Sequence, residues 1–286
     1  MLSDINWVLD FRTPALTQFF TLCPHLVGDY FLLGIFAITY WISSRSKPHW
    51  LDLGAMIILS SILNRVLKEI FAVARPTVHK LITLSDMSYS FPSGDAQIFT
   101  VVSLMIAYYF RSNIALLIAA IMIVIVAVSR VYLGVHCPID VVCGVIVGYM
   151  TFIGYKKYGY GRLGLMITRV NILMQFGLYF LLSCVYYLIM QKHFGRMDVM
   201  MLALLAGIWL GYYMLPKQLQ YKRVNLIVAI LGIIITGAII YFFKIILKNS
   251  VLPKDITTIT VFITYFFISF FIVYVLPKIG YSLQRK

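Results

Sequence analysis

The sequence predicts an all-α fold, a polytopic bundle of helices embedded in a membrane. Hydrophobic residues make up 62% of the 286 positions and charged residues 12%, about half the charged share of a soluble domain. Apolar runs of about 17–25 residues, long enough to cross a bilayer as a helix, recur along the chain. Short polar breaks separate these runs. Together the three observations exclude a soluble globular protein.

Nine apolar runs are interpreted as transmembrane helices. The breaks between them are polar, and no soluble domain, low-complexity tract or internal repeat interrupts the series. One break, Ala72–Asp95, is much longer than the rest. We expect about nine transmembrane helices, at residues 25–43, 51–71, 96–111, 114–131, 139–155, 168–190, 197–215, 224–247 and 257–277.

The segment before the first span is expected to lie at the membrane–water interface. It lacks the basic start of a signal peptide and carries Asp4 and Asp10. Its Trp7 and Phe11 are aromatic residues of the kind that favour the interface.

The later spans carry recognisable start and contact signals. Ser93 is a natural N-cap for the third span, and Pro138 suits the first helical position of the fifth. Two pairs of glycines have the G-x-x-x-G spacing, which predicts contacts between helices rather than ligand sites: Gly144 with Gly148, and Gly207 with Gly211.

The net charge of +14 is interpreted as a sign of membrane topology and not of nucleic-acid binding. Basic residues collect in short loops, as they do on the cytoplasmic side of membrane proteins. If alternate loops and the C-terminal tail share one side, only Asp52 among the acids lies near that side. The long break, the 132–138 turn and the N-terminus then face outward. The side assigned to the cytoplasm holds thirteen of the 24 lysines and arginines: Arg45, Lys47, Arg111, Lys156, Lys157, Arg162, Arg169, Lys217, Lys222, Arg223, Lys278, Arg285 and Lys286.

Cationic side chains gather near the outer end of the second span. Arg65 and Lys68 are three residues apart, and Arg75 follows Lys68 by two helical turns, so all three can line one helix face. Pro76 biases Arg75 out of the helix, which places its guanidinium at the mouth of the site. Ionisable residues in membrane spans are costly and indicate function.

A histidine and an aspartate follow the fourth span. Arg130 ends that span, His136 lies in a turn that Gly134 and Pro138 predict to be at the surface, and Asp140 falls four residues later. At this spacing the Asp140 carboxylate can accept the imidazole N–H, which fixes the tautomer and leaves the other ring nitrogen as base or nucleophile.

A third segment, Pro92–Gly94, lies between these two in the sequence and presents free backbone N–H groups at a helix start, which is a favourable place for a phosphate. All three segments end on the side assigned to the outside. Cations, a helix start and a His–Asp pair suit attack on a phosphate ester or anhydride. No acidic cluster offers a cage to Mg²⁺, so we expect neither a metal nor any other cofactor.

The four cysteines are scattered and are interpreted as small apolar residues: Cys23, Cys137, Cys143 and Cys184.

The three segments resemble the motifs of the phosphatidic acid phosphatase type 2 family, which shares its site with vanadium haloperoxidases and glucose-6-phosphatase. K-x6-R-P is Lys68 to Pro76, P-S-G is Pro92 to Gly94, and S-R-x5-H-x3-D is Ser129 to Asp140. The resemblance implies a metal-independent membrane phosphatase acting on lipid phosphates or diphosphates at the outer leaflet. It implies His136 as the nucleophile that forms a phosphohistidine and Asp140 as the residue that orients it. The implied phosphate-binding residues are Lys68, Arg75, Ser93, Gly94 and Arg130.

Asp95 departs from the family pattern, in which a histidine follows P-S-G and protonates the leaving group. We interpret Asp95 as a weakened general acid that makes the enzyme prefer acidic pH and favours diphosphates, whose leaving group needs less help. One alternative is that Asp95 only caps the third span and pairs with Arg75 or Arg130. The other is that the chain is a catalytically inactive relative that binds or moves phospholipid.

The resemblance also divides the chain. A six-helix phosphatase core is expected within residues 1–190, and residues 191–286 are expected to add further transmembrane helices. We expect an integral protein of the cell (inner) membrane with its active site on the extracytoplasmic face. Prenyl diphosphates, phosphatidylglycerophosphate and phosphatidic acid all remain open as substrates, as does a lipid phosphotransferase that passes the phosphoryl group to another head group.

Overall fold

The computed structural model describes residues 6–42, 47–76, 81, 89–159, 170–191, 193–219, 224–249 and 254–284. Every regular element in these residues is a helix, so the all-α prediction is confirmed. In chain order the elements are η1 (Asn6–Phe11), α1 (Pro14–Val27), α2 (Asp29–Ile42), α3 (Lys47–Phe71), α4 (Gly94–Phe110), α5 (Asn113–Tyr132), α6 (Pro138–Gly154), η2 (Tyr155–Gly159), α8 (Ile172–Met190), α9 (Arg196–Met214), η3 (Lys217–Leu219), α10 (Leu226–Asn249), α11 (Lys254–Phe270), η4 (Phe271–Val275) and α12 (Leu276–Gln284).

Each predicted span coincides with a helix, and the main differences lie at the two ends. The stretch before the first span forms a separate helix, α1, which Thr13 begins by accepting a hydrogen bond from the Leu16 amide at 3.3 Å. Pro14 then takes the first helical position. This pair of start signals was not used in predicting the spans. At the other end, α11, η4 and α12 follow one another without a break from Lys254 to Gln284.

Six helices in the described part of the chain are both long enough and apolar enough to cross a membrane. Two shorter apolar helices lie at Leu32–Trp41 and Gly94–Phe110. The long helix α3 is not one of the six, and it carries Asp52, Arg65 and Lys68. The count of nine transmembrane helices therefore remains a prediction.

The chain forms two compact units. One contains Met1–Leu32 and Leu59–Tyr158, and the other contains Leu33–Ile58 and Gly159–Lys286. All of the predicted site residues belong to the first unit. This division describes packing, and the proposed boundary between a phosphatase core and additional helices near residue 190 stays a prediction.

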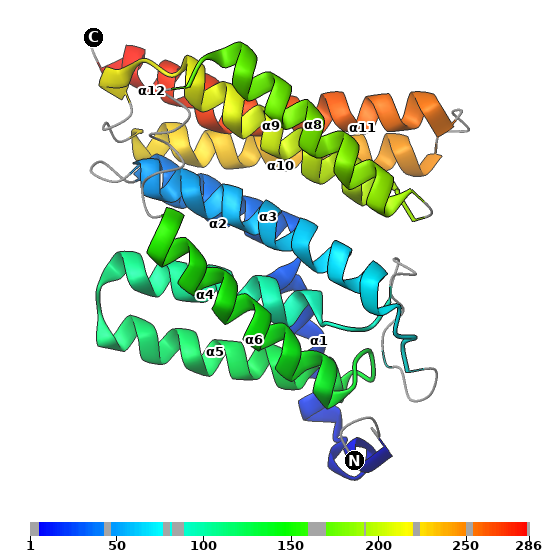
Figure 1. Cartoon of the computed structure of the whole chain (residues 1–286). Helices are drawn as coiled ribbons and strands as arrows, with labels where there is room; N and C mark the ends of the chain where they lie inside the picture. The colour runs from blue at the N-terminus through cyan, green and yellow to red at the C-terminus, as the bar shows by residue number, and fades with distance from the viewer. Residues whose placement is uncertain are drawn as a thin grey trace. The chain divides into compact units, whose positions relative to one another are not determined.

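In the first unit, α4 packs on both α5 and α6, and α6 crosses the other two helices obliquely (Figure 1). Close packing of α6 on α4 depends on glycine. A Cβ at Gly144 would lie 2.5 Å from the Ser93 carbonyl oxygen, and one at Gly148 would lie 2.5 Å from the Gln97 carbonyl oxygen. The prediction that these glycines mark a helix contact is confirmed.

Replacing Gly148 by alanine is expected to lower the midpoint of thermal unfolding. The new methyl group would meet the α4 backbone, which cannot move aside as a side chain can, and overpacking typically costs about 1–3 kcal/mol. Gly154→Ala on the same helix is the matched control, because among the described residues no atom beyond its own stretch of helix lies within 4 Å of its added Cβ. Equal midpoints for the two variants, measured in the same detergent, would contradict this account of the α4–α6 contact.

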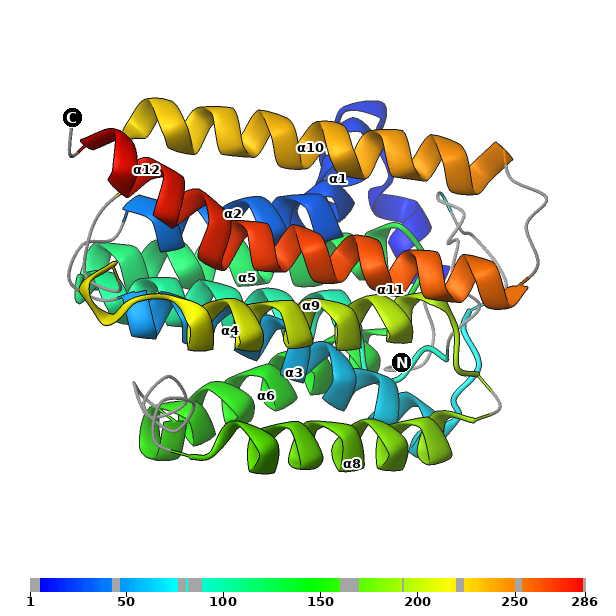
Figure 2. The same ribbon diagram turned by 90° about the horizontal axis from the view of Figure 1, so that it is seen from above.

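The second unit is built around the packing of α9 on α11 (Figure 2). Here too glycines make the approach possible, because a Cβ at Gly207 would overlap the Phe266 carbonyl oxygen and the Ser269 hydroxyl. A Cβ at Gly211 would lie 3.1 Å from Val273 Cβ. The second G-x-x-x-G pair is therefore also a helix contact.

Candidate active site

The structure brings the three predicted segments together in the first unit. The amide of Ser93, at the start of α4, donates to the carbonyl oxygen of Asp140 in α6 at 2.9 Å. The segment that leaves α3 is tied to the segment that enters α4, because the Ser90 amide donates to the Val73 carbonyl oxygen at 2.7 Å. Residues separated by about seventy positions in the chain thus form one polar cluster at the ends of their helices.

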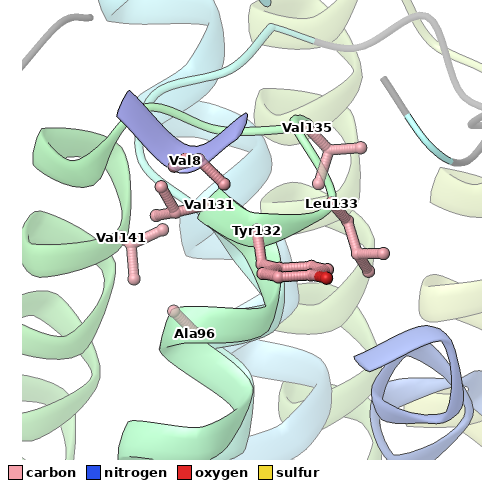
Figure 3. Packing of buried hydrophobic residues seen from close by; sticks show 7 residues of the cluster. All are labelled: Val8, Ala96, Val131, Tyr132, Leu133, Val135 and Val141. Carbon is pink, nitrogen blue, oxygen red and sulfur yellow. The ribbon is translucent and has the colours of Figure 1, made fainter. Parts of the chain in front are cut away.

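The turn that carries His136 is anchored by an apolar cluster (Figure 3). Leu133 and Val135 are fully buried, and His136 is only 3% exposed. Gly134 between them has a φ of 72°, a conformation that favours glycine. The surface turn predicted from Gly134 and Pro138 is therefore wrong, because its apolar side chains pack inward. The cluster consists of Val8, Ala96, Val131, Tyr132, Leu133, Val135 and Val141.

Both ring nitrogens of His136 have polar neighbours. Nδ1 lies 3.2 Å from the hydroxyl oxygen of Ser90, and Nε2 lies 3.2 Å from Nη1 of Arg75. A guanidinium can only donate, so Nε2 must accept. The tautomer that satisfies both contacts has its proton on Nδ1 and a lone pair on Nε2.

Burial lowers the pKa of His136 to about 4, with the positive charges of Lys68 and Arg75 acting in the same direction. The contact with Asp140 opposes this shift without cancelling it. The imidazole is therefore neutral near pH 7, which is the state in which Nε2 can act as a nucleophile.

Asp140 was predicted to accept directly from His136, and the contact in the structure is less direct. The Asp140 Oδ2 to His136 Nδ1 distance is 3.5 Å, which is long for a hydrogen bond. The same oxygen accepts from the Ser90 hydroxyl at 2.6 Å and from the Cys137 amide at 2.9 Å. Because α6 begins at Pro138, Asp140 lies in the first turn as predicted. Its hydrogen bond with the Cys137 amide also caps the start of this helix.

Arg75 reaches the site by a different route from the one predicted. Helix α3 ends at Phe71 and Ala72 has a φ of 48°, so Arg75 does not share a helix face with Lys68. Its guanidinium comes from the following segment and also donates to the Val135 carbonyl oxygen at 3.3 Å. The expectation that Pro76 keeps Arg75 out of the helix agrees with this geometry.

Lys68 is buried at the last turn of α3. The residue is only 5% exposed, and its Nζ donates a hydrogen bond to the Tyr89 carbonyl oxygen at 2.5 Å. The ammonium group therefore lies beside the segment that precedes α4. It does not extend to the interface as a snorkelling lysine would.

The start of α4 matches the prediction in position but not in its cap. Ser93 is the N-cap residue, yet its hydroxyl makes no capping hydrogen bond. Ser93 Oγ is buried and has no hydrogen-bond partner among the described residues. The amides that begin α4 at Gly94 and Asp95 have no acceptor within the helix. A hydroxyl and a helix start are thus both placed to donate to an anion.

Arg130 and Asp95 form an ion pair. Nη1 of Arg130 donates to Asp95 Oδ2 at 2.5 Å, and Nε donates to Ser129 Oγ at 3.3 Å. Nη2 is buried, and no described residue forms a hydrogen bond with it. The Arg130 side chain is 1% exposed and that of Asp95 is 37% exposed. Asp95 therefore lies at the open side of the site, on a guanidinium that is predicted to bind phosphate.

Two buried polar residues that the sequence did not single out support this cluster. Asn64 Nδ2 donates to the Pro92 carbonyl oxygen at 3.2 Å and to Gln97 Oε1 at 2.9 Å. Gln97 Nε2 donates to Ser60 Oγ at 3.1 Å. A Cβ at Gly94 would lie 2.8 Å from Asn64 Oδ1, so this close approach requires glycine. Their position inside apolar spans was the signal that could have identified them.

Comparison with known proteins points to the part of the chain that contains these residues. The family model described as the PAP2 superfamily matches residues 49–163. Phosphatidylglycerophosphatase B of Bacillus subtilis (strain 168) is 32% identical over 158 residues, which cover 51% of this chain and 77% of the relative. The chain belongs to the PAP2 superfamily. The resemblance inferred from the three motifs is thereby confirmed.

Two solved structures are similar to part of this chain. The crystal structure of a transmembrane PAP2 type phosphatidylglycerolphosphate phosphatase from Bacillus subtilis has a TM-score of 0.50 and 29% identity, covering 54% of this chain and 81% of that one. LpxE of Aquifex aeolicus has a TM-score of 0.47 and 22% identity, covering 54% of this chain and 93% of that one. The PAP2 match ends at residue 163, before α8 begins.

His136 is expected to remain uncharged in mildly acidic solution. Its pKa of about 4 lies below the ordinary value of 6.5. As the pH falls, a histidine with the ordinary pKa therefore gains a proton before His136 does. The unfolded chain would bind a proton that the folded site does not, and stability should decrease as the pH falls from about 6.5 to about 4. Nitrogen-15 NMR of histidine-labelled protein, with His136→Gln to assign the signal, measures the charge. A charged His136 at about pH 5.5 would contradict the expectation.

Proposed function

We propose that this PAP2 protein is a membrane phosphatase that hydrolyses a lipid phosphate or diphosphate through a phosphohistidine on His136. The observation that carries the proposal is the neutral imidazole whose Nε2 lone pair faces Arg75, 3.2 Å away. A nucleophile and a phosphate-binding cation thus meet at one point. The phosphatase names of two similar proteins from Bacillus subtilis support the same reaction class.

We propose that the phosphoryl group is held by donors of the predicted phosphate-binding residues. Arg75 can transfer its Nη1 hydrogen bond from Nε2 to a phosphoryl oxygen, which binds the substrate and frees the nucleophile. Within the described part of the chain, Ser93 Oγ and Arg130 Nη2 are buried and have no hydrogen-bond partner, and a phosphoryl oxygen is an acceptor for both. Lys68 and the Gly94 amide complete the predicted set.

The reaction then proceeds in two displacements. The Nε2 lone pair attacks phosphorus, the bond from phosphorus to the leaving oxygen breaks, and that oxygen takes its electron pair together with a proton. The imidazole ring becomes cationic, and the Asp140 carboxylate offsets this charge. Water next attacks the phosphohistidine, the phosphorus–nitrogen bond breaks, and the proton lost by water returns to the group that supplied the first one.

Asp95 is the proposed source of that first proton. To act as an acid, the carboxyl group must separate from Arg130, to which Oδ2 is now bound at 2.5 Å. An arriving phosphoryl group competes for the same guanidinium and provides the force for this separation. The same ion pair favours a second candidate function, a catalytically inactive phospholipid-binding protein, because Asp95 occupies a predicted phosphate ligand.

A phosphate-release assay separates these functions. Purified protein is incubated in detergent with phosphatidic acid, phosphatidylglycerophosphate or farnesyl diphosphate, with and without EDTA. Release from at least one lipid, unchanged by EDTA, is the expected result. No release from any of them by folded protein would favour the inactive relative. Addition of a lipid acceptor, followed by product analysis, distinguishes transfer from hydrolysis.

We also propose that the site faces the extracytoplasmic side of the cell membrane, as the distribution of basic loops predicts. Much of the Thr77–Ser90 and 156–169 loops lies outside the described residues. Leu81 and Tyr158, in or beside these loops, are exposed. An impermeant thiol reagent added to intact cells is expected to label Leu81→Cys and not Tyr158→Cys, with the parent protein giving the background. Strong labelling of Tyr158→Cys would overturn this orientation.

A further inference from the structure

Ser90 lies between the two residues of the predicted His–Asp pair. Its hydroxyl oxygen is 2.6 Å from Asp140 Oδ2 and 3.2 Å from His136 Nδ1. Ser90 is 1% exposed, and Asp140 and His136 are both buried as well. The direct distance between Asp140 Oδ2 and His136 Nδ1 is 3.5 Å, so the serine contacts are the shorter ones.

The proton positions in this group follow from the donors that are present. A carboxylate only accepts, so the single hydroxyl proton of Ser90 points to Asp140. The Ser90 oxygen is then left with lone pairs for His136, and Nδ1 must carry the ring proton. Arg75 requires the same arrangement from the other side of the ring, because it can only donate to Nε2.

The Ser90 hydroxyl is held in place by backbone contacts. Its amide donates to the Val73 carbonyl oxygen at 2.7 Å, and the preceding carbonyl, of Tyr89, accepts from Lys68 Nζ at 2.5 Å. The segment that supplies Arg75 is thus joined to the segment that supplies Ser90. A shift of either segment would therefore alter the contacts of both ring nitrogens of His136.

We propose that Ser90 is a positioning residue for the nucleophile, relaying a hydrogen bond from His136 Nδ1 to the Asp140 carboxylate. The proposal rests on the proposed role of His136 in catalysis. Under it, the serine and not Asp140 alone selects the tautomer with a free Nε2. When Nε2 bonds to phosphorus and the ring becomes cationic, the relay also connects that charge to the carboxylate.

Removal of the hydroxyl should therefore affect turnover more than binding. In Ser90→Ala, Nδ1 loses its nearest acceptor and faces Asp140 across 3.5 Å. We expect kcat to fall about 10–100-fold, the usual effect of losing an orienting partner. KM should stay within about twofold because no phosphate donor has changed. Ser90→Thr keeps the hydroxyl and should recover most of the lost activity.

The kinetic test compares these variants on dioleoyl phosphatidic acid and farnesyl diphosphate in detergent micelles. Ser183→Ala is the matched control, because the Ser183 hydroxyl donates to the Tyr179 carbonyl oxygen of its own helix, at 2.8 Å, and belongs to the other unit of the chain. If Ser90→Ala does not fold, Ser90→Cys takes its place as the variant with a weaker acceptor. Wild-type kcat in Ser90→Ala or Ser90→Cys, or equal loss in the threonine variant, would overturn the relay.

A second measurement needs no substrate and so separates this inference from the proposed function. Nitrogen-15 NMR of histidine-labelled protein near pH 7 reports which ring nitrogen of His136 bears the proton, with His136→Gln as the assignment control. The wild type should show protonated Nδ1. Ser90→Ala should show a larger share of the tautomer with protonated Nε2, because Arg75 is then the remaining contact that favours a proton on Nδ1. An unchanged tautomer in Ser90→Ala would refute the relay even if the enzyme is active. Conversely, an inactive wild type with the expected tautomer shift would refute only the proposed function.

Discussion

Replacing His136 by alanine should reduce phosphate release by about 10³-fold or more, because loss of a nucleophile removes the covalent route. No other described histidine can take its place, since Nε2 of His136 is the ring nitrogen that contacts Arg75. Initial rates with phosphatidic acid and farnesyl diphosphate measure the effect. Retention of even a tenth of wild-type activity would show that the phosphohistidine mechanism is wrong.

The His136 test needs a folding control, because the turn is buried and not at the surface. Leu133 and Val135 anchor it independently of the imidazole, so the alanine variant should keep its secondary structure and elute as the wild type does. Asp140→Asn provides a graded comparison. It leaves His136 able to attack from a poorly held tautomer, and its loss of activity should be smaller.

Replacing Asp95 by asparagine should lower kcat and KM together. The amide cannot donate the proton of a carboxylic acid, and general acid catalysis contributes roughly 10²–10⁴-fold. At the same time the ion pair at 2.5 Å is lost, and Arg130 Nη1 becomes available to the phosphoryl group. A joint decrease of kcat and KM distinguishes this double role from a merely structural one.

The leaving group and the pH profile complete the Asp95 experiment. Asp95→Asn should reduce hydrolysis of phosphatidic acid more than that of farnesyl diphosphate, because an alkoxide needs protonation more than a phosphate does. Asp95→His should move the pH optimum upward in assays from about pH 4.5 to 8. If the asparagine variant matches the wild-type kcat on both lipids at every pH, Asp95 is no acid and serves only to pair with Arg130.

The sequence by itself determined the all-α class, the helices and the family. These properties are local or periodic, because a run of apolar residues must form its backbone hydrogen bonds within one helix when it lies in lipid. The glycine contacts of α6 on α4 were equally predictable, since only glycine permits such an approach. The convergence of Lys68, His136 and Arg130 could be expected from the order of the helix ends alone.

Only the tertiary structure decided how the polar groups are paired. The position of Ser90 between His136 and Asp140 depends on contacts between residues 46 and 50 positions apart in the chain. The Arg130–Asp95 pair spans 35 positions. Arg75 enters from a segment beyond α3, so helical spacing could not place it. Side-chain spacing along one helix says nothing about which donor of another element lies nearest. That choice is made by packing, because buried polar groups must find partners within the fold.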